Sequence, residues 1–189
     1  MKRALRLVFM LAITGCLPVI TRAQSLNGPY HFEKSIHVPG NGGWDYLAMD
    51  TVHQRLFVSH GDQVDVINTV KQTVSSTIKG LQGVHGIAIA YGLNRGFISN
   101  GKGNAVTAFD LSSLKTIATI PVTGKDPDCI VYDPYSKEVF TFNGDSQNST
   151  VIDAKSLKVV GTISLGGSPE FAVSDGKGKI FNNLEDKNE

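Results

Sequence analysis

The sequence predicts an all-β fold, a β-propeller with four-stranded antiparallel blades, and three observations carry this prediction. The 189 residues include 20 glycines, 7 prolines and only 3 methionines, which indicates many turns and few long helices. Short runs rich in Val, Ile, Thr and Phe alternate with turns of Gly, Pro, Asn and Asp, a pattern typical of strands. The runs recur in sets of four, and the repeated phenylalanines Phe57, Phe97, Phe140 and Phe181 are 40, 43 and 41 residues apart. A period of about 42 residues with four strands matches a propeller blade.

The first run of each repeat is apolar on both faces, as expected for an inner strand that is fully buried. We predict these inner strands near residues 45–50, 86–90, 128–133 and 170–174. The second run contains the repeated phenylalanine and is predicted at 55–60, 95–100, 138–143 and 179–183.

The third run is predicted at 63–68, 105–110 and 149–153. The fourth run, at 73–78, 115–120 and 158–163, alternates polar and apolar residues as an outer strand does. The blades then comprise residues 45–82, 83–124 and 125–167, followed by an incomplete fourth blade at 168–189. A β-sandwich or a solenoid is the alternative, but a sandwich would not keep the phenylalanine register over four repeats.

Residues 31–38 resemble the fourth run rather than the first. We predict that they form an outer strand that closes the ring by completing the last blade. A ring normally needs four to eight blades, so residues 24–189 are expected to be a partial propeller from a longer protein. The alternative is a four-bladed ring whose last blade lacks a strand.

The first 23 residues predict an export signal. Lys2 and Arg3 precede an apolar run that is too short for a comfortable membrane span, and residues 21–23 form a cleavage site. A second interpretation is a bacterial lipobox at residues 13–16, in which Cys16 would carry a lipid anchor. The expected location is therefore periplasmic or secreted, with a membrane-anchored lipoprotein as the alternative.

Composition excludes several function classes. The net charge of +1 depends on four basic residues within the first 23; without them 14 basic residues face 17 acidic ones, which does not favour nucleic-acid binding. Cys129 would be the one cysteine left after cleavage, so no internal disulfide is expected. The sequence has no Cys-x-x-Cys-His motif for haem attachment.

Four segments carry a family resemblance: residues 42–46 (GGWDY), 55–61 (RLFVSHG), 83–88 (GVHGIA) and 169–172 (PEFA). They resemble the exported YncE-like bacterial proteins, which belong to the YVTN β-propeller repeat group. The resemblance covers residues 30–189 and implies a seven-bladed ring, of which this chain would be roughly the N-terminal half. The Tyr-Val-Thr-Asn signature has drifted to residues 57–60 (FVSH) and 97–100 (FISN). Because propellers host many functions, the resemblance implies little about chemistry.

A candidate site follows from the antiparallel order of the strands. The start of each inner strand lies beside the end of the second strand, at one mouth of the central channel. The inner strands start at ionisable residues: Asp45, His85, Asp128 and Glu170. The second strands end at His60, Asn100 and Asn143, which we predict as a second ring of the site. Carboxylates crowded at this mouth would repel one another, so one is expected to hold a proton.

These side chains could bind a divalent cation, grip a polar ligand or supply a general base. They could equally solvate the rim of a wet channel. The first functional hypothesis is therefore a scaffold that binds a small polar ligand or a protein partner at the channel mouth. The alternative is a metal-dependent hydrolase, similar to lactonase propellers. A quinone cofactor is not expected, because such propellers usually carry a tryptophan in most blades and this sequence has only Trp44.

Overall fold

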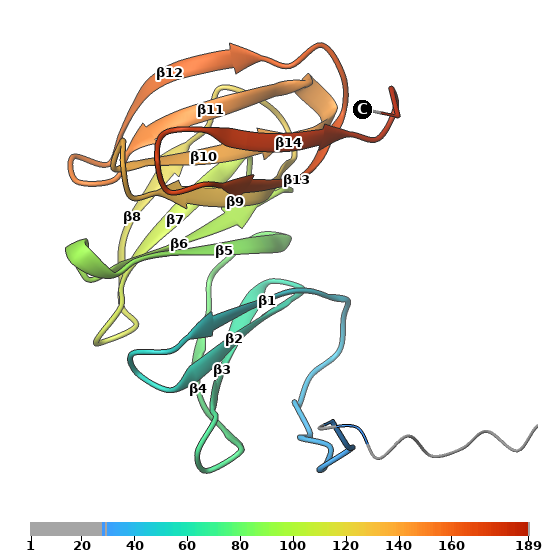
Figure 1. Ribbon diagram of the computed structural model, residues 1–189. Coiled ribbons are helices and arrows are strands. Elements are labelled where there is room, and N and C mark those ends of the chain that lie inside the picture. The colour runs from blue at the N-terminus through green and yellow to red at the C-terminus, as the bar shows by residue number, and fades with distance from the viewer. Residues whose placement is uncertain (1–27, 29, 189) are drawn as a thin grey trace, which may run out of the picture. The chain divides into compact units, whose positions relative to one another are not determined.

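The computed structural model describes residues 28 and 30–188 (Figure 1). The chain divides into two compact units, residues 1–34 and 35–189, and the strands of the described residues lie in the second. The signal sequence predicted at residues 1–23 and the lipid anchor at Cys16 lie outside the described residues. No helix among the described residues is long and apolar enough to cross a membrane.

The second unit consists of antiparallel sheets in which each strand pairs with its neighbours in sequence. Blade 1 contains β1 (Trp44–Asp50), β2 (Arg55–His60), β3 (Gln63–Asn68) and β4 (Thr73–Ile78). Blade 2 contains β5 (Val84–Ala90), β6 (Arg95–Asn100), β7 (Ala105–Asp110) and β8 (Thr116–Pro121). Blade 3 contains β9 (Pro127–Asp133), β10 (Glu138–Asn143), β11 (Asn148–Asp153) and β12 (Lys158–Ser164), and blade 4 contains β13 (Pro169–Ser174) and β14 (Ile180–Leu184). The all-β prediction is confirmed: the helical segments described are single 3₁₀ turns, Tyr91–Leu93 and Gly144–Ser146.

The closing strand predicted at residues 31–38 stays a prediction, because these residues pair with no strand among the described residues. A closing strand needs the third strand of the last blade as its partner. Blade 4 pairs only β13 with β14 within the described residues, so that partner is not available. The resemblance of 31–38 to an outer strand lies in its sequence pattern, which alone does not create a ladder.

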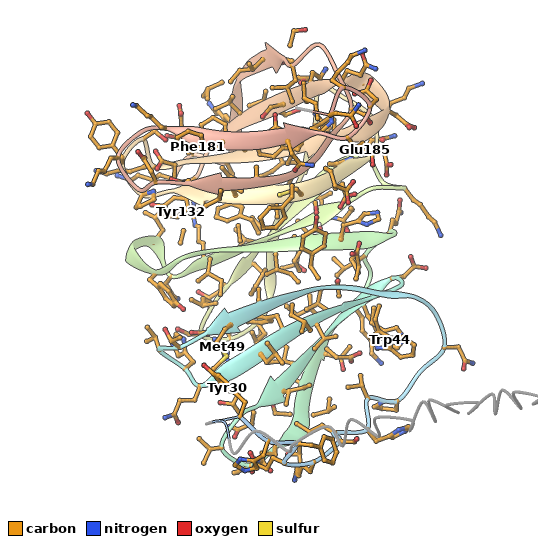
Figure 2. All side chains as sticks on the ribbon, turned by 45° about the vertical axis from the view of Figure 1, so that its right-hand side comes forward. Tyr30, Trp44, Met49, Tyr132, Phe181 and Glu185 are labelled. Atoms are coloured by element: carbon orange, nitrogen blue, oxygen red, sulfur yellow. The ribbon has the colours of Figure 1, made fainter. Side chains whose placement is uncertain are left out.

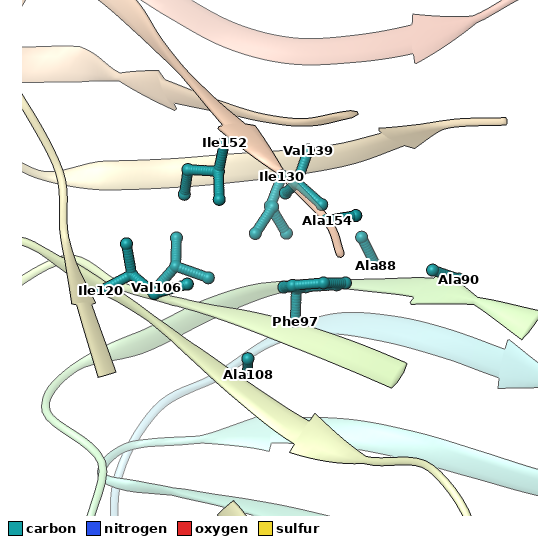
Figure 3. Close-up of a cluster of buried hydrophobic side chains, with 10 residues drawn as sticks. All are labelled: Ala88, Ala90, Phe97, Val106, Ala108, Ile120, Ile130, Val139, Ile152 and Ala154. Atoms are coloured by element: carbon teal, nitrogen blue, oxygen red, sulfur yellow. The ribbon is translucent and has the colours of Figure 1, made fainter. Parts of the chain in front are cut away.

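The inner strands β1, β5, β9 and β13 lie side by side in chain order (Figure 1). The apolar core fills the spaces between successive blades. Figure 3 shows the cluster between blades 2 and 3, where fully buried Phe97 lies among side chains from both sheets. A second cluster between blades 1 and 2 contains Phe57 and Phe109, whose rings pack edge to face at 5.6 Å between centroids. A fully buried phenylalanine contributes about 1.5–3 kcal/mol through its apolar area, so Phe57 and Phe97 stabilise the contacts between blades.

Arginines at the start of the second strands in blades 1 and 2 tie each of these two blades to the next. Arg55 donates to Asp50 Oδ2 (2.6 Å) in its own blade and to the carbonyl oxygen of Leu111 (2.6 Å) in blade 2. Arg95 donates in the same way to the carbonyl oxygen of Ala154 in blade 3. Because these contacts recur with the repeat, they fix the relation between neighbouring blades.

The first and last blades present apolar side chains to solvent. Met49 on β1 and Phe181 on β14 are about half exposed, and Figure 2 shows them on separate outer sheets of the arc. Leu47 in β1 and Phe171 in β13 are also exposed. Large exposed apolar patches are unusual on a monomer and indicate an unfilled packing surface.

Candidate functional site

The start of every inner strand carries the same irregularity. In each blade, two residues of the inner strand lie opposite a single residue of the second strand. The two residues lie between Trp44 and Leu47, Val84 and Ile87, Pro127 and Ile130, and Pro169 and Ala172. Such a β-bulge bends the strand and re-aims its side chains. The first bulged residue is Asp45, His85, Asp128 or Glu170, so all four predicted site residues occupy one structural position.

Side chains of the second strands hold these bulges in place. The amide of Tyr46 donates to Ser59 Oγ (2.6 Å), and the amide of Gly86 donates to Ser99 Oγ (2.8 Å). In blade 4 the amide of Phe171 donates to Asn183 Oδ1 (2.9 Å). Blade 3 differs, because Phe142 occupies this position and packs in an apolar cluster with Cys129 and Ala172. Burial raises the pKa of the Cys129 thiol to about 12, which makes it an unreactive core residue.

The structure brings three of the four predicted residues together. His85 Nδ1 lies 2.7 Å from Asp45 Oδ2 and 3.7 Å from Asp128 Oδ1. One ligand atom from each of Asp45, His85 and Asp128 lies within 4.8 Å of the other two. Glu170 is exposed and is not part of this group, although the Tyr46 hydroxyl donates to its backbone oxygen (3.4 Å). We call Asp45, His85 and Asp128 the mouth cluster.

Asp126 is a further member of the site that the sequence analysis missed. Its Oδ1 lies 3.9 Å from His85 Nε2. The other ring nitrogen, Nδ1, is the one that lies near Asp45 and Asp128. Asp126 precedes the strand and has a left-handed backbone (φ 57°), and its amide donates to Asn104 Oδ1 (2.9 Å). The sequence did contain a hint, because this aspartate comes only two residues before Asp128. The position of a residue in a loop, however, does not determine where its side chain points.

The electrostatics of the cluster centre on Asp128. Burial raises the pKa of Asp128 to about 6; His85 opposes the shift, and the charges of Asp45, Glu170 and Asp126 add to it. Its Oδ1 is buried and accepts no hydrogen bond from any described residue. The shift has the expected direction, but a carboxyl with a pKa of about 6 is mostly ionised at neutral pH, and burial rather than repulsion is its largest cause. Burial and the negative charge of Asp128 also raise the pKa of the Tyr46 hydroxyl far above its usual value.

Gly101 forms one wall of the site. A Cβ atom at this position would lie 2.5 Å from Asp126 Oδ1 and 2.6 Å from His85 Nε2. Both distances are shorter than real Cβ contacts, so any other residue at 101 would displace the imidazole. Gly101 therefore belongs to the site because its missing side chain leaves room for the imidazole of His85.

The predicted second ring of His60, Asn100 and Asn143 is not part of the mouth cluster. Asn100 is buried and donates to the backbone oxygens of Ile98 and Ala105 within its own blade. Asn143 is buried and donates to Asn148 Oδ1 (2.7 Å). His60 is also buried, and Trp44 stacks on its ring at 4.5 Å between centroids. The second strands end beside the inner-strand starts as expected, but their last side chains turn into the sheets.

The mouth cluster combines two carboxylates with an imidazole, a set that suits a hard or borderline divalent cation. It could also hold a cationic group of a polar ligand. Three blades supply its side chains, so the cluster depends on the ring arrangement and not on one sheet alone.

Comparisons with known proteins agree with this architecture. Hydrazine synthase from Kuenenia stuttgartiensis matches with a TM-score of 0.70 and 18% identity, over 82% of this chain and 46% of that chain. A functionally unknown protein from Desulfotomaculum acetoxidans matches with a TM-score of 0.67 and 16% identity, over 77% of this chain and 50% of that one. The WD40 β-propeller domain of Doa1 matches with a TM-score of 0.67 and 12% identity, over 78% of this chain and 50% of that one. The chain therefore spans about half the length of these structures, and at such identities the likeness shows the fold alone.

The sequence has no significant match among curated proteins. The model of one protein family, the YNCE-like beta-propeller, matches residues 46–175. This range begins within β1 and includes the bulged inner strands β5, β9 and β13 and all of blades 2 and 3. The resemblance inferred from the sequence motifs is thus confirmed, and the chain belongs to the YNCE-like β-propeller family.

Proposed function

We propose that this chain belongs to an exported β-propeller that binds a divalent cation, or the cationic group of a small polar ligand, at the mouth of its channel. Export is inferred from residues 1–23, with a location in the periplasm or outside the cell. The lipobox at Cys16 gives a membrane-anchored lipoprotein as the alternative.

The observation that carries the proposal is the convergence of Asp45, His85 and Asp128 from three blades, with their ligand atoms within 4.8 Å of one another. Rim residues that only solvate a channel would be expected to point into water. Instead, a buried oxygen of Asp128 has no hydrogen-bond partner among the described residues. An unsatisfied buried oxygen costs about 1–3 kcal/mol, and a bound cation would offset that cost.

Calorimetric titration of the metal-free full-length chain with Ca²⁺, Mn²⁺ and Zn²⁺ tests the proposal. We expect one of these ions to bind, and Asp128→Asn to weaken its binding by at least about tenfold, or about 1.4 kcal/mol. Asp145→Asn is the matched control, because Asp145 is an exposed acidic residue outside the mouth cluster. Failure of all three ions to bind, or equal losses in the two variants, would contradict binding of a divalent cation at the mouth cluster.

A second candidate function is metal-assisted hydrolysis, favoured by the position of Asp126. A bound cation lowers the pKa of its water ligand, and a carboxylate beside the cluster could then accept a proton from that water. Asp126, 3.9 Å from His85 Nε2, is the carboxylate placed for this role. Metal-dependent turnover of a lactone that Asp126→Asn abolishes, with cation binding retained, would support this function over simple binding.

A further inference from the structure

A second polar site lies in blade 1 and shares no residue with the mouth cluster. His60 is only 2% exposed, yet its Nε2 atom accepts from and donates to no described residue. Buried polar side chains nearly always have a partner, so an unpaired imidazole nitrogen indicates a missing one.

The opposite edge of the same ring is fixed. His60 Nδ1 lies 2.9 Å from Asp65 Oδ2, and Asp65 also accepts hydrogen bonds from Gln63 Nε2 and Thr77 Oγ1. Because a carboxylate only accepts, Nδ1 carries a proton and Nε2 is the edge left for another group. A carboxylate that holds one imidazole nitrogen in this way orients the other toward a ligand.

His60 is also one of the residues that line a cavity of about 500 Å³, together with the loop at residues 40–43, Gly61, Asp62, Gln63, Lys79 and Lys102. The loop lies directly over the ring: a Cβ atom at Gly40 would be 2.5 Å from His60 Cε1 and 3.3 Å from Nε2. Gly40 and Gly42 have positive φ (129° and 135°), a conformation that side chains disfavour. Glycine at these positions therefore allows the backbone to approach the imidazole.

The charges that face the cavity favour an anion. Lys79 and Lys102 line it, and neither forms an ion pair with a described residue. The acidic residue in the wall, Asp62, accepts a hydrogen bond from the amide of Gly83 (2.8 Å) and keeps its negative charge, so the two lysines outnumber it. Asp65 contacts the imidazole at Nδ1 and not at Nε2. An oxyanion would then accept from Nε2–H and from both ammonium groups, and such charge-assisted hydrogen bonds are the strong ones.

We propose that this cavity, the His60 pocket, binds the phosphate or carboxylate group of a small ligand. His60 and the two lysines would donate to its oxygens, and Asp65 would position the imidazole without touching the ligand. The inference does not depend on cation binding at the mouth cluster.

Inorganic phosphate and succinate, each titrated into the ¹⁵N-labelled full-length chain, probe the pocket through the imidazole nitrogens in NMR spectra. We expect one of the two anions to shift the His60 Nε2 resonance, and the anion that does so identifies the oxyanion. The double variant Lys79→Ala/Lys102→Ala should bind that anion at least about tenfold more weakly, because it loses two charge-assisted hydrogen bonds. Both lysines are exposed, so this variant keeps the fold.

Lys115→Ala is the matched control, since Lys115 is an exposed lysine of blade 2 outside the cavity. It should bind the anion as the unmodified chain does. If neither anion shifts the His60 Nε2 resonance, the proposal is wrong. Equal binding by the double variant and the control would also overturn it, because the response would then be a general charge effect.

Discussion

The carboxyl group of Asp128 reaches the mouth cluster from blade 3 and leaves one oxygen without a hydrogen bond. Burial and neighbouring negative charges raise its pKa to about 6. In an unfolded chain the same group would ionise near its ordinary pKa of about 3.9. The folded protein therefore binds this proton more tightly than the unfolded chain, and ionisation of Asp128 works against folding as the pH rises through this window.

Asp128→Asn is expected to stabilise the protein at neutral pH in the absence of a cation. The raised pKa corresponds to a gain of about 1–2 kcal/mol in the free energy of unfolding, allowing for solvent screening of a side chain that is 24% exposed. The gain should vanish below about pH 4, where the carboxyl group is protonated in both states. Denaturant unfolding at several pH values measures the difference, and a variant less stable than the unmodified chain at pH 7 would contradict the account.

Cation affinity at the mouth cluster should fall as the pH is lowered through about 6, because the proton on Asp128 competes with the ion. Calorimetry of the same ion above and below this pH measures the loss. Affinity that does not change across this range would mean that Asp128 is not a ligand.

Gly101→Ala should abolish cation binding while most of the fold is kept. Its Cβ atom would occupy the space of His85 Nε2 and Asp126 Oδ1 and push the imidazole out of place. Gly103→Ala is the matched control, since the nearest atom to a Cβ there is Gln82 Oε1 at 3.2 Å, the end of a flexible side chain. Equal cation affinities for the two variants would argue against this position for His85.

At the scale of strands, the bulge determines where the site residues point. Ser99 Oγ accepts from the amide of Gly86 and donates to the carbonyl oxygen of Asp128, so one hydroxyl ties the blade 2 bulge to the blade 3 strand. Asp128 thus depends on a residue in a neighbouring blade. The same hydroxyl in blade 1, from Ser59, binds only within its own blade.

Ser99→Ala should therefore lower the free energy of unfolding by about 1–2 kcal/mol, because it leaves a buried amide and a carbonyl without a partner. It should also weaken cation binding, since Asp128 loses its support. Ser112→Ala, an exposed hydroxyl in a turn, should change neither. Denaturant unfolding and calorimetry of the two variants provide the comparison, and a Ser99→Ala variant with unchanged stability would contradict this role.

The strands were predictable from the sequence because their signals are local. The spacing of the phenylalanines and the Gly, Asn and Asp turns determine the strands of blades 1 to 3 to within a residue or two. The bulge was not predictable, because an extra residue at a strand start leaves the apolar pattern intact. Because the bulge was not foreseen, we expected the last side chains of the second strands, such as Asn100, at the mouth of the channel. In the structure, Asn100 instead donates a hydrogen bond within its own sheet. The closing strand at 31–38 stays a prediction, because a strand forms only with a partner and the described part of blade 4 pairs β13 with β14 alone.

At the scale of the whole molecule, successive blades bury their facing surfaces, and the two outer blades of this arc do not. Leu47 and Met49 on β1, and Phe171 and Phe181 in blade 4, are exposed. In the structures that match, this chain corresponds to about half of the length. Further blades packed on these faces would bury them as the cores between blades 1, 2 and 3 are buried.

A preparation limited to these 189 residues is expected to self-associate through the exposed faces, since exposed apolar patches and strand edges promote pairing between chains. Replacing Met49 and Phe181 with serine should shift the preparation toward monomer, whereas replacing exposed Tyr135, which lies in a turn, should not. Sedimentation velocity measures the distribution. A stable monomer before any substitution would contradict the open-ring interpretation.

The most direct test of the account is to locate the cation itself. Crystals of the protein grown with Mn²⁺ and measured at the manganese absorption edge give an anomalous difference map that marks every bound ion. We expect a peak among Asp45, His85 and Asp128, at ligand distances of about 2.0–2.3 Å, and no peak there in Asp128→Asn crystals. A map without a peak at the mouth cluster would show that these residues line the channel without binding a metal.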